Sequence, residues 1–511
     1  MNKSYKKFLF FSLAILFVIL VPVTILYSQG YRFDFNARKI VQTGGFYFRV
    51  TPSGARIFIE NGPSKKTSFF SSGAFIGGLL PKTYQVTIER DGYHSWNKAL
   101  TVFEKRVTEA KNIHLFPLHT SFELLLENAI DFFPHPQTKD IIIKSYPEKR
   151  ADRTESNPWQ IELLNFQSKQ KTKLVSAQEL VALLPKTASP ELLNFSNLEW
   201  SPNKKEMLIE TVLRGQKKYF LIDFTAFDIL AFSLDIPVRA DNVLMSQARS
   251  KEVFYLAPMA NNNIQADSAG PIAIEQENGQ KNAIFRLKIT ESEPELKQET
   301  ALLPTTLKET EIIAFTLADD NIFWLSGAGL ANYGKIGQTN ITLIEVLNKK
   351  PYSISPNLNY RLVADYPARL LLKENEALYY LNPRIAAFEK IFDVAKDVKI
   401  SPDRNKIAIR TDYQVWVFFP EKDLDQPARE TGEKILLSAF NDYIDNIFWL
   451  NSHYLIFQEK DSIKIAEIDN RSNVNIVEIA SFPGLKMFWN NWAKTLFVLS
   501  KNTLYYSTDL P

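Results

Sequence analysis

A short pattern of alternating residues recurs through the chain from about Ala129 to its end. Each copy has an aromatic or apolar pair, a Ser-Pro-polar turn, and two stretches in which apolar and polar residues alternate. The clearest copies span 198–209, 352–363 and 398–409, and weaker copies begin near 132, 243, 313, 447 and 487. Because a period of two indicates a half-buried strand, each copy predicts antiparallel strands joined by tight turns.

The spacing of the copies predicts how these strands assemble. The stronger copies recur at roughly 40–50 residues, the length of a four-stranded propeller blade. Radial repetition also leaves few strand edges exposed. About eight copies therefore predict a β-propeller of seven or eight blades over residues 120–511, with six still possible. The Ser-Pro-Asp turns, as at Ser401 to Asp403, resemble the propeller repeats of the Tol-system periplasmic protein and of prolyl peptidases.

The amino-terminal segment is uncharged from Phe8 to Tyr27 and follows a start that carries Lys3, Lys6 and Lys7. Roughly 20 helical residues cross the ~30 Å hydrocarbon core of a bilayer. Basic residues on the short leading segment favour its retention in the cytoplasm. We therefore expect a cytoplasmic tail over 1–7, a transmembrane signal-anchor helix over 8–27, a juxtamembrane linker over 28–43, and the bulk of the chain outside the cytoplasm of a single-pass cell-membrane protein.

A cleaved signal peptide is the alternative interpretation of this segment. Signal peptides usually have an apolar region of about 7–15 residues that ends at a small-x-small site. The run here is longer and leaves through Leu26 to Gly30 without such a site, which favours an uncleaved anchor. The chain contains no cysteine, which excludes lipid acylation of a cysteine, disulfides and thiolate metal sites. Its net charge of +3 points to no nucleic acid partner.

Residues 44–117 contain shorter alternating stretches. One face carries Ala55, Ile57 and Ile59, and the next clear stretch carries Tyr84, Val86 and Ile88 on one face. Turn residues separate the stretches, at 61–62, 80–81 and 91–92. This pattern predicts a small β-sandwich of roughly 70 residues.

Three motifs follow one another in this region. They are a Pro-x-Gly-Ala turn at 52–55, Leu-Pro-Lys-Thr-Tyr-Gln-Val at 80–86 and Asp-Gly-Tyr-His-Ser-Trp at 91–96. In this order they resemble motifs of the PEGA domain, although Lys82 replaces a usual glycine and residues 67–76 are longer and more aromatic than the family's loop. The resemblance implies an extracytoplasmic β-sandwich module, often beside a membrane anchor, with no associated catalytic role.

Several segments depart from the repeated pattern. Ser176 and Glu179 have the spacing of a capping box and predict a short helix after Ser176. Residues 258–281 predict a flexible polar loop, and the charge-rich stretches 290–300 and 420–434 predict solvated loops. Because loops carry function more often than scaffolds do, we expect a partner site in these insertions.

No motif predicts a catalytic, cofactor-binding or metal-binding residue. The five histidines have no spacing that converges on a metal: His94, His114, His119, His135 and His453. There is no Gly-x-Ser-x-Gly elbow, and Gly327 to Gly334 indicates a turn rather than a phosphate loop. The acidic pairs 319–320 and 442/445 indicate solvated turns.

Aromatic residues offer a weaker alternative. Tyr93 and Trp96 have faces suited to stacking on a sugar, but packing at the edge of the sandwich is the simpler interpretation. Trp449 and Trp489 lie at alternating positions and are expected between blades.

These observations favour a non-catalytic binding or scaffolding protein of the cell envelope, with no cofactor, whose propeller presents a surface to a protein or glycan. The binding residues stay unassigned. The alternative is an envelope enzyme that acts on glycans through acidic residues from several blades. A sensor that signals through the helix is a third possibility, although the tail of seven residues leaves little to signal with.

Overall fold

The computed structural model describes residues 3–35, 38–60, 62–68, 70–147, 158–184, 189–201, 204–225, 229–246, 248–259, 281–289, 297–304, 311–337, 340–365, 369–508 and 510. The chain divides into two compact units. The first comprises Met1–Glu123, Asp397–Trp489 and Ser507–Pro511, and the second comprises Leu124–Lys396 and Asn490–Tyr506.

A single long helix, α1 (Lys3–Ser28), begins the first unit. Its segment Lys7–Ser28 has a mean hydropathy of 2.9 and is the one helix in the described part of the chain that is long and apolar enough to cross a membrane. Pro22 lies in its last third. The helix fits a single-pass anchor or a signal sequence, and it contains the predicted span 8–27.

The residues after the helix form a hairpin, where only a linker was predicted. Strand β1 (Tyr31–Asp34) pairs antiparallel with β2 (Lys39–Gln42). Each strand has four residues, which is too short for a period of two to stand out in the sequence.

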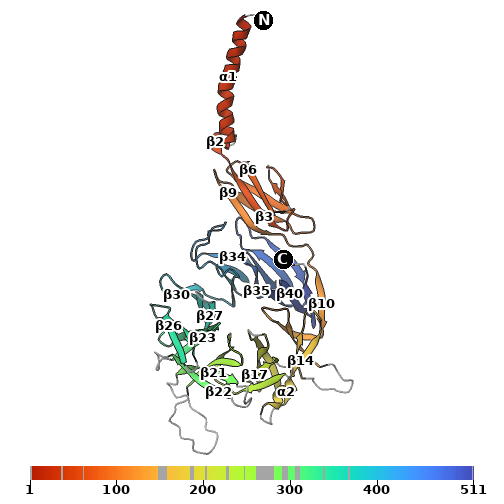
Figure 1. The fold of residues 1–511 in the computed structure, drawn as a ribbon, viewed down its shortest axis with the longest axis vertical. Helices are drawn as coiled ribbons and strands as arrows, with labels where there is room; N and C mark the ends of the chain where they lie inside the picture. The colour runs from red at the N-terminus through yellow and green to blue at the C-terminus, as the bar shows by residue number, and fades with distance from the viewer. Residues whose placement is uncertain are drawn as a thin grey trace, which may run out of the picture. The chain divides into compact units, whose positions relative to one another are not determined.

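The predicted small sandwich consists of two sheets, visible in orange in Figure 1. One sheet has the order β6-β3-β9 and the other β5-β4-β7-β8. The strands are β3 (Gly44–Thr51), β4 (Arg56–Ile59), β5 (Lys65–Lys66), β6 (Gly73–Leu79), β7 (Thr83–Glu89), β8 (Trp96–Thr101) and β9 (Val107–His114). The predicted inward residues Ile57, Val86 and Ile88 are buried with Phe46 and Phe48 in one core. The turn residue Asn61 lies outside the described residues.

Two four-stranded antiparallel meanders complete most of the first unit. The first consists of β31 (Asp397–Ile400), β32 (Ile407–Arg410), β33 (Gln414–Phe418) and β34 (Lys434–Ala439). The second consists of β35 (Ile444–Asn451), β36 (Tyr454–Glu459), β37 (Ser462–Glu467) and β38 (Ile476–Ser481), and β39 (Lys486–Asn490) follows it. Val417, Leu455 and Phe457 belong to a core that the two meanders share.

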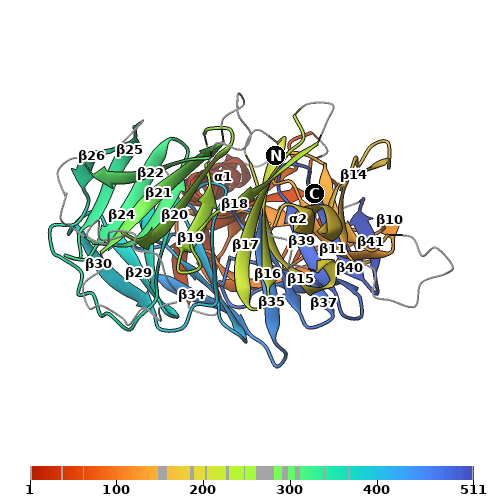
Figure 2. The same ribbon diagram turned by 90° about the horizontal axis from the view of Figure 1, so that it is seen from below.

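The second unit contains five more meanders, several of which can be followed in Figure 2. The first two are β11 (Ala129–Pro134), β12 (Ile141–Ser145), β13 (Gln160–Leu164) and β14 (Lys171–Ser176), and β15 (Leu193–Trp200), β16 (Glu206–Leu213), β17 (Gln216–Asp223) and β18 (Leu230–Leu234). Helix α2 (Ala177–Ala182), which has the predicted capping box at Ser176, and the 3₁₀ turn η1 (Pro190–Leu192) connect them.

The next two meanders share one eight-stranded sheet. They are β19 (Asp241–Met245), β20 (Glu252–Pro258), β21 (Asn282–Ile289) and β22 (Lys297–Pro304), and β23 (Ile312–Ala318), β24 (Asn321–Ser326), β25 (Ala331–Ile336) and β26 (Asn340–Val346). The fifth consists of β27 (Tyr360–Asp365), β28 (Arg369–Glu374), β29 (Ala377–Asn382) and β30 (Ala387–Phe392). In addition, β10 (Phe122–Glu127) lies beside β41 (Thr503–Ser507), which pairs with β40 (Thr495–Ser500).

These four-stranded sheets are blades of a β-propeller, which confirms the predicted mainly β fold class. All five weaker sequence copies coincide with first strands: β11, β19, β23, β35 and β39. The copy at 352–363 is out of phase, because its Ser-Pro turn precedes β27 instead of following a first strand. The stretch 290–300 was predicted as a loop because it is rich in charged residues. Strand β22 nevertheless begins at Lys297, where the backbone pairs with β21. Of the loop predicted at 258–281, residues 260–280 lie outside the described part.

Candidate functional site

In the first unit, the sandwich contacts the blades through the edges of both of its sheets. On β8, the Asn97 and Ala99 amides donate to Asn475 Oδ1 (3.3 Å) and Ser472 Oγ (3.0 Å). On β9, the Glu109 amide donates to Gln426 Oε1 at 2.8 Å. Side chains of blade loops thus pair edge-strand amides that would otherwise be exposed. The segment 420–434, which was predicted as a solvated loop, supplies one of these contacts.

A buried ion pair lies at the centre of this contact. Lys98 Nζ is 2.7 Å from Glu467 Oε1, and their side chains are 0% and 5% exposed. The ammonium group also donates to the carbonyls of Asp469 (2.6 Å) and Asn473. Trp96 Nε1 donates to Glu467 Oε2 at 2.8 Å. Burial raises the pKa of Glu467, although Lys98 and Trp96 oppose this increase.

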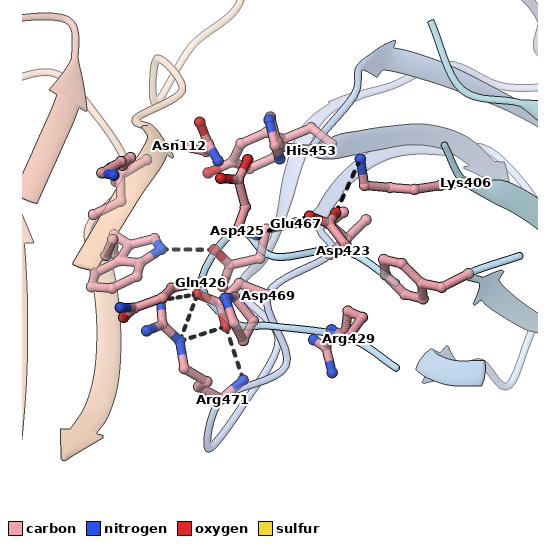
Figure 3. A pocket seen from close by; sticks show the side chains of 18 residues that line it. Asn112, Lys406, Asp423, Asp425, Gln426, Arg429, His453, Glu467, Asp469 and Arg471 are labelled. Atoms are coloured by element: carbon pink, nitrogen blue, oxygen red, sulfur yellow. Dashed lines mark hydrogen bonds and ion pairs between the residues drawn. The ribbon is translucent and has the colours of Figure 1, made fainter. Parts of the chain in front are cut away.

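Beside the ion pair lies a small cavity of about 50 Å³, shown in Figure 3. Two of its basic groups have acidic partners within the first unit: Arg471 Nη2 is 2.6 Å from Asp469 Oδ2, and Lys406 Nζ is 3.7 Å from Asp423 Oδ2. A space of this size holds one or a few waters. We therefore assign these residues to holding the sandwich on the blades rather than to binding a ligand.

Two of the five histidines meet in this contact. The pKa of His114 is lowered by burial and then by His453, and that of His453 is lowered by burial and then by Lys406. Elsewhere, His94 interacts with His119 and the ring of His135 packs against Trp200 at 4.8 Å. Among the described residues, no three or more His, Asp or Glu side chains are grouped to hold a metal.

Other candidate residues of the sequence have structural positions. Trp96 is buried and Tyr93 packs against the sandwich core, so this pair offers no stacking surface for a sugar. Asp319 has a positive φ in the β23–β24 turn. Asp445 accepts from Gln458 at 3.1 Å. Of the turn predicted from Gly327 to Gly334, residues 327–330 form the β24–β25 turn, whereas residues 331–334 already belong to β25.

A larger cavity, with a volume of about 680 Å³, lies in the second unit. Its lining includes Glu311, Ser355, Asn359 and Tyr360 and the apolar side chains of Leu256 and Ile313. A second cavity of about 330 Å³ shares three residues with it: Asp241, Asn242 and Arg361. The two spaces are therefore neighbours, and the shared residues belong to the first strands β19 and β27.

The cavity of about 330 Å³ is lined by three residues with carboxyl groups, each from a different strand: Glu199, Glu210 and Asp241. Burial raises the pKa of Glu199 to about 7, although the Met245 amide donates to its Oε2 at 3.1 Å and opposes the increase. Glu210 Oε1 is 3.2 Å from Lys217 Nζ and accepts from Ser196 Oγ at 3.0 Å. The pKa of Tyr219 is raised by burial and by Glu210.

This lining combines charges of both signs with amide and hydroxyl groups. Such groups can hydrogen-bond a polar ligand that also covers the apolar patches of Leu256 and Ile313. Glu199 is in addition a carboxyl group that is partly protonated near neutral pH and can donate a proton.

Sequence reasoning did not identify either arrangement. Lys98 and Glu467 are distant in the chain, and Glu199 and Arg361 lie on different blades. A local signal existed for Lys98, which stands between Trp96 and Leu100 at buried alternate positions of β8.

The raised pKa of Glu199 predicts a pH-dependent stability. The Glu199 carboxyl has a pKa of about 7 in the folded protein and about 4.5 in the unfolded chain, so the folded state holds its proton more tightly. The stability that this gives to the fold is fully present below pH 4.5 and is lost as the pH rises through 7. We expect Glu199→Gln to stabilise the full-length protein by roughly 2 kcal/mol at pH 8 and by little at pH 4, after allowance for partial exposure. Thermal unfolding at both pH values measures this difference.

The matched control is Glu210→Gln on the adjacent strand. It removes the partner of Lys217, so stability at pH 8 should fall or stay level rather than rise. An equal effect of Glu199→Gln at both pH values would contradict the assigned titration.

No protein-family model matches the chain. No curated protein matches it either. Among solved structures, it is similar to the β-propeller domain of Myceliophteria thermophila Cps50 (Swd1), with 10% identity, a TM-score of 0.35, and coverage of 76% of this chain and 99% of that one. It is also similar to BamB from Moraxella catarrhalis, with 11% identity, a TM-score of 0.39, and coverage of 76% and 99%. A prolyl endopeptidase structure has 11% identity and a TM-score of 0.40, and the match spans 74% of this chain and 55% of that one.

Proposed function

We propose that this protein is a non-catalytic binding or scaffolding protein, anchored in the cell membrane by α1, with its bulk outside the cytoplasm. The small sandwich then serves as a PEGA-like base, and the blades bind an envelope protein or glycan. The polar cavity of the second unit, with its neighbour at Asp241, Asn242 and Arg361, is the observation that carries the proposal. Its mixed lining suits a ligand rich in hydrogen-bonding groups.

The orientation of the proposed protein follows from the lysines before the helix. Attachment of the sandwich to the blades gives the proposal a mechanical basis. Edge amides of β8 and β9 and the buried Lys98–Glu467 pair hold the two parts of the first unit together.

The absence of cysteine allows a direct test of the cavity. Arg361→Cys places one thiol at both cavities, and Lys350→Cys places one on an exposed position of the same unit. After thiol-directed crosslinking in intact envelopes, we expect an adduct to a protein or glycan from Arg361→Cys and none from Lys350→Cys.

Charge at the cavity provides the second arm of this experiment. In a pull-down of the full-length chain, Arg361→Glu should no longer bind the partner that the crosslinking identified, and Lys350→Glu should still bind it. Identical adducts from both cysteine positions, or retention of the partner by Arg361→Glu, would remove the cavity from the proposal.

A glycan-cleaving enzyme is the second candidate function, and Glu199 is the observation that favours it. Glycoside hydrolysis uses a protonated carboxylic acid together with a carboxylate, and Glu210 and Asp241 share the cavity with Glu199. Incubation of the purified protein with isolated cell-wall glycan distinguishes the candidates. New reducing ends from the wild type but not from Glu199→Gln would replace the binding proposal, whereas equal backgrounds would support it.

A further inference from the structure

We propose that the β1–β2 hairpin is a second membrane contact, whose apolar face lies in the lipid headgroup region beside the end of α1. The occupant of this face is a phospholipid bilayer. The inference rests on the proposed function, because it takes α1 as an uncleaved anchor.

Chain length places the hairpin close to the bilayer. Helix α1 ends at Ser28 and β1 begins at Tyr31. Three residues span at most about 11 Å. The apolar helical segment of 22 residues matches a hydrocarbon core of about 30 Å, beyond which a headgroup layer of about 5–7 Å follows on each side. The hairpin therefore starts in this layer or at its edge.

Hydrogen bonds connect the hairpin to the end of the helix. Arg32 Nη1 donates to the Tyr27 carbonyl at 2.8 Å, and its guanidinium carbon lies 3.3 Å from the centre of the Tyr27 ring. On the other strand, Gln42 Nε2 donates to the Gln29 carbonyl at 3.0 Å. Both strands are thus held to the residues that leave the membrane.

One face of the hairpin is apolar and exposed. Phe33 is 48%, Phe35 83% and Ile40 61% exposed. Phe33 pairs with Ile40 across the strands, and the rings of Phe33 and Phe35 are 5.1 Å apart. Cross-strand pairing brings Phe33 and Ile40 to the same face, and the ring contact places Phe35, the residue after β1, beside Phe33. On the opposite face Arg32 pairs with Val41, which is buried.

The charges around this face also suit a lipid surface. Arg38 and Lys39 are exposed at the turn end of β2. Basic side chains at this level can interact favourably with lipid phosphates. Aromatic side chains are likewise enriched at the interface. The hairpin is continuous with the anchor, has an exposed apolar face and has basic side chains beside that face. Together these features favour a bilayer over a soluble partner.

Single-cysteine spin labelling of the full-length chain tests this placement, since the protein has no cysteine of its own. Labels are introduced by Phe33→Cys, Phe35→Cys and Ile40→Cys, in liposomes of phosphatidylcholine with and without phosphatidylglycerol. We expect high accessibility to oxygen and low accessibility to a water-soluble nickel chelate at all three. Phe70→Cys, at a sandwich position that is 97% exposed, should show the reverse.

A label from Leu16→Cys in α1 separates the two hypotheses. If this label is accessible to the chelate, the anchor fails and the proposed function fails with it. If it is in lipid while the hairpin labels are accessible to the chelate, only the hairpin inference is overturned. Hairpin labels that neither reagent reaches would indicate cover by protein, such as a second copy, and would also overturn it.

Discussion

Replacement of Lys98 by methionine is expected to destabilise the first unit by roughly 3–5 kcal/mol, because it leaves the buried charge of Glu467 without its partner. The ammonium group contacts Glu467 Oε1 at 2.7 Å and two backbone carbonyls, and its side chain is completely buried. Methionine keeps most of the apolar stem but satisfies none of these acceptors. Hydrogen exchange of β8 and β37 in the full-length protein should therefore accelerate.

The expected defect depends on pH. Burial already raises the pKa of Glu467, and removal of Lys98 should raise it further because Lys98 acts in the opposite direction. A buried carboxyl group with a raised pKa lowers the stability of the fold when it is ionised, at high pH. It has no such effect at low pH, where it is protonated. The loss caused by Lys98→Met should consequently be larger at pH 8 than at pH 5.

Two variants serve as controls for the Lys98 prediction. Arg56→Met breaks an ion pair on the same sandwich, but its side chain and that of Asp91 are 61% and 96% exposed, so little change is expected. In Lys98→Met/Glu467→Gln the buried charge is gone, and much of the lost stability should return. If Lys98→Met proved as harmless as Arg56→Met, the ion pair could not be what holds the sandwich on the blades.

Local patterns predicted most of the fold. The alternation at Ile57, Val86 and Ile88 identified buried positions of the sandwich, and the Ser176/Glu179 spacing identified the start of α2. These signals depend on neighbours within a few residues, where the side-chain period and capping chemistry act directly. The β1–β2 hairpin escaped because each of its strands has only four residues.

The candidate sites could not be predicted in the same way, because they depend on contacts between distant segments. Gln426 belongs to a charge-rich stretch whose composition predicts a solvated loop. Its side chain nevertheless accepts a hydrogen bond from the amide of Glu109, 317 residues away. In the sequence, Glu199 looks like any polar residue of an alternating strand. Only the fold buries it and so raises its pKa. A lysine at a buried alternate position, such as Lys98, is the signal that could have shown a charged contact, but not its partner.

Gly329→Ala is expected to have the second large effect, a loss of about 2–5 kcal/mol in the second unit. Gly329 has a φ of +76°, and a Cβ atom there would lie 1.9 Å from the Tyr352 carbonyl oxygen and 2.8 Å from its backbone nitrogen. The Gly329 carbonyl accepts from the Tyr352 amide at 2.8 Å and from Asn348 Nδ2 at 2.9 Å. The turn therefore cannot move away without breaking these bonds. Accelerated exchange in β24 and β25 and a lower unfolding temperature of the full-length protein would measure the loss.

Gly215→Ala is the matched control, because Gly215 has a φ of +81° and a Cβ atom there would meet no other atom within 4 Å. It lies in the hairpin turn between β16 and β17, so this change adds only the backbone strain, about 1 kcal/mol. The difference between the two variants isolates the steric clash from the left-handed conformation. Equal losses would mean that conformation alone requires glycine at 329. A larger loss at Gly329 would show that the close approach of Tyr352, rather than any phosphate-binding role, explains the glycine of this turn.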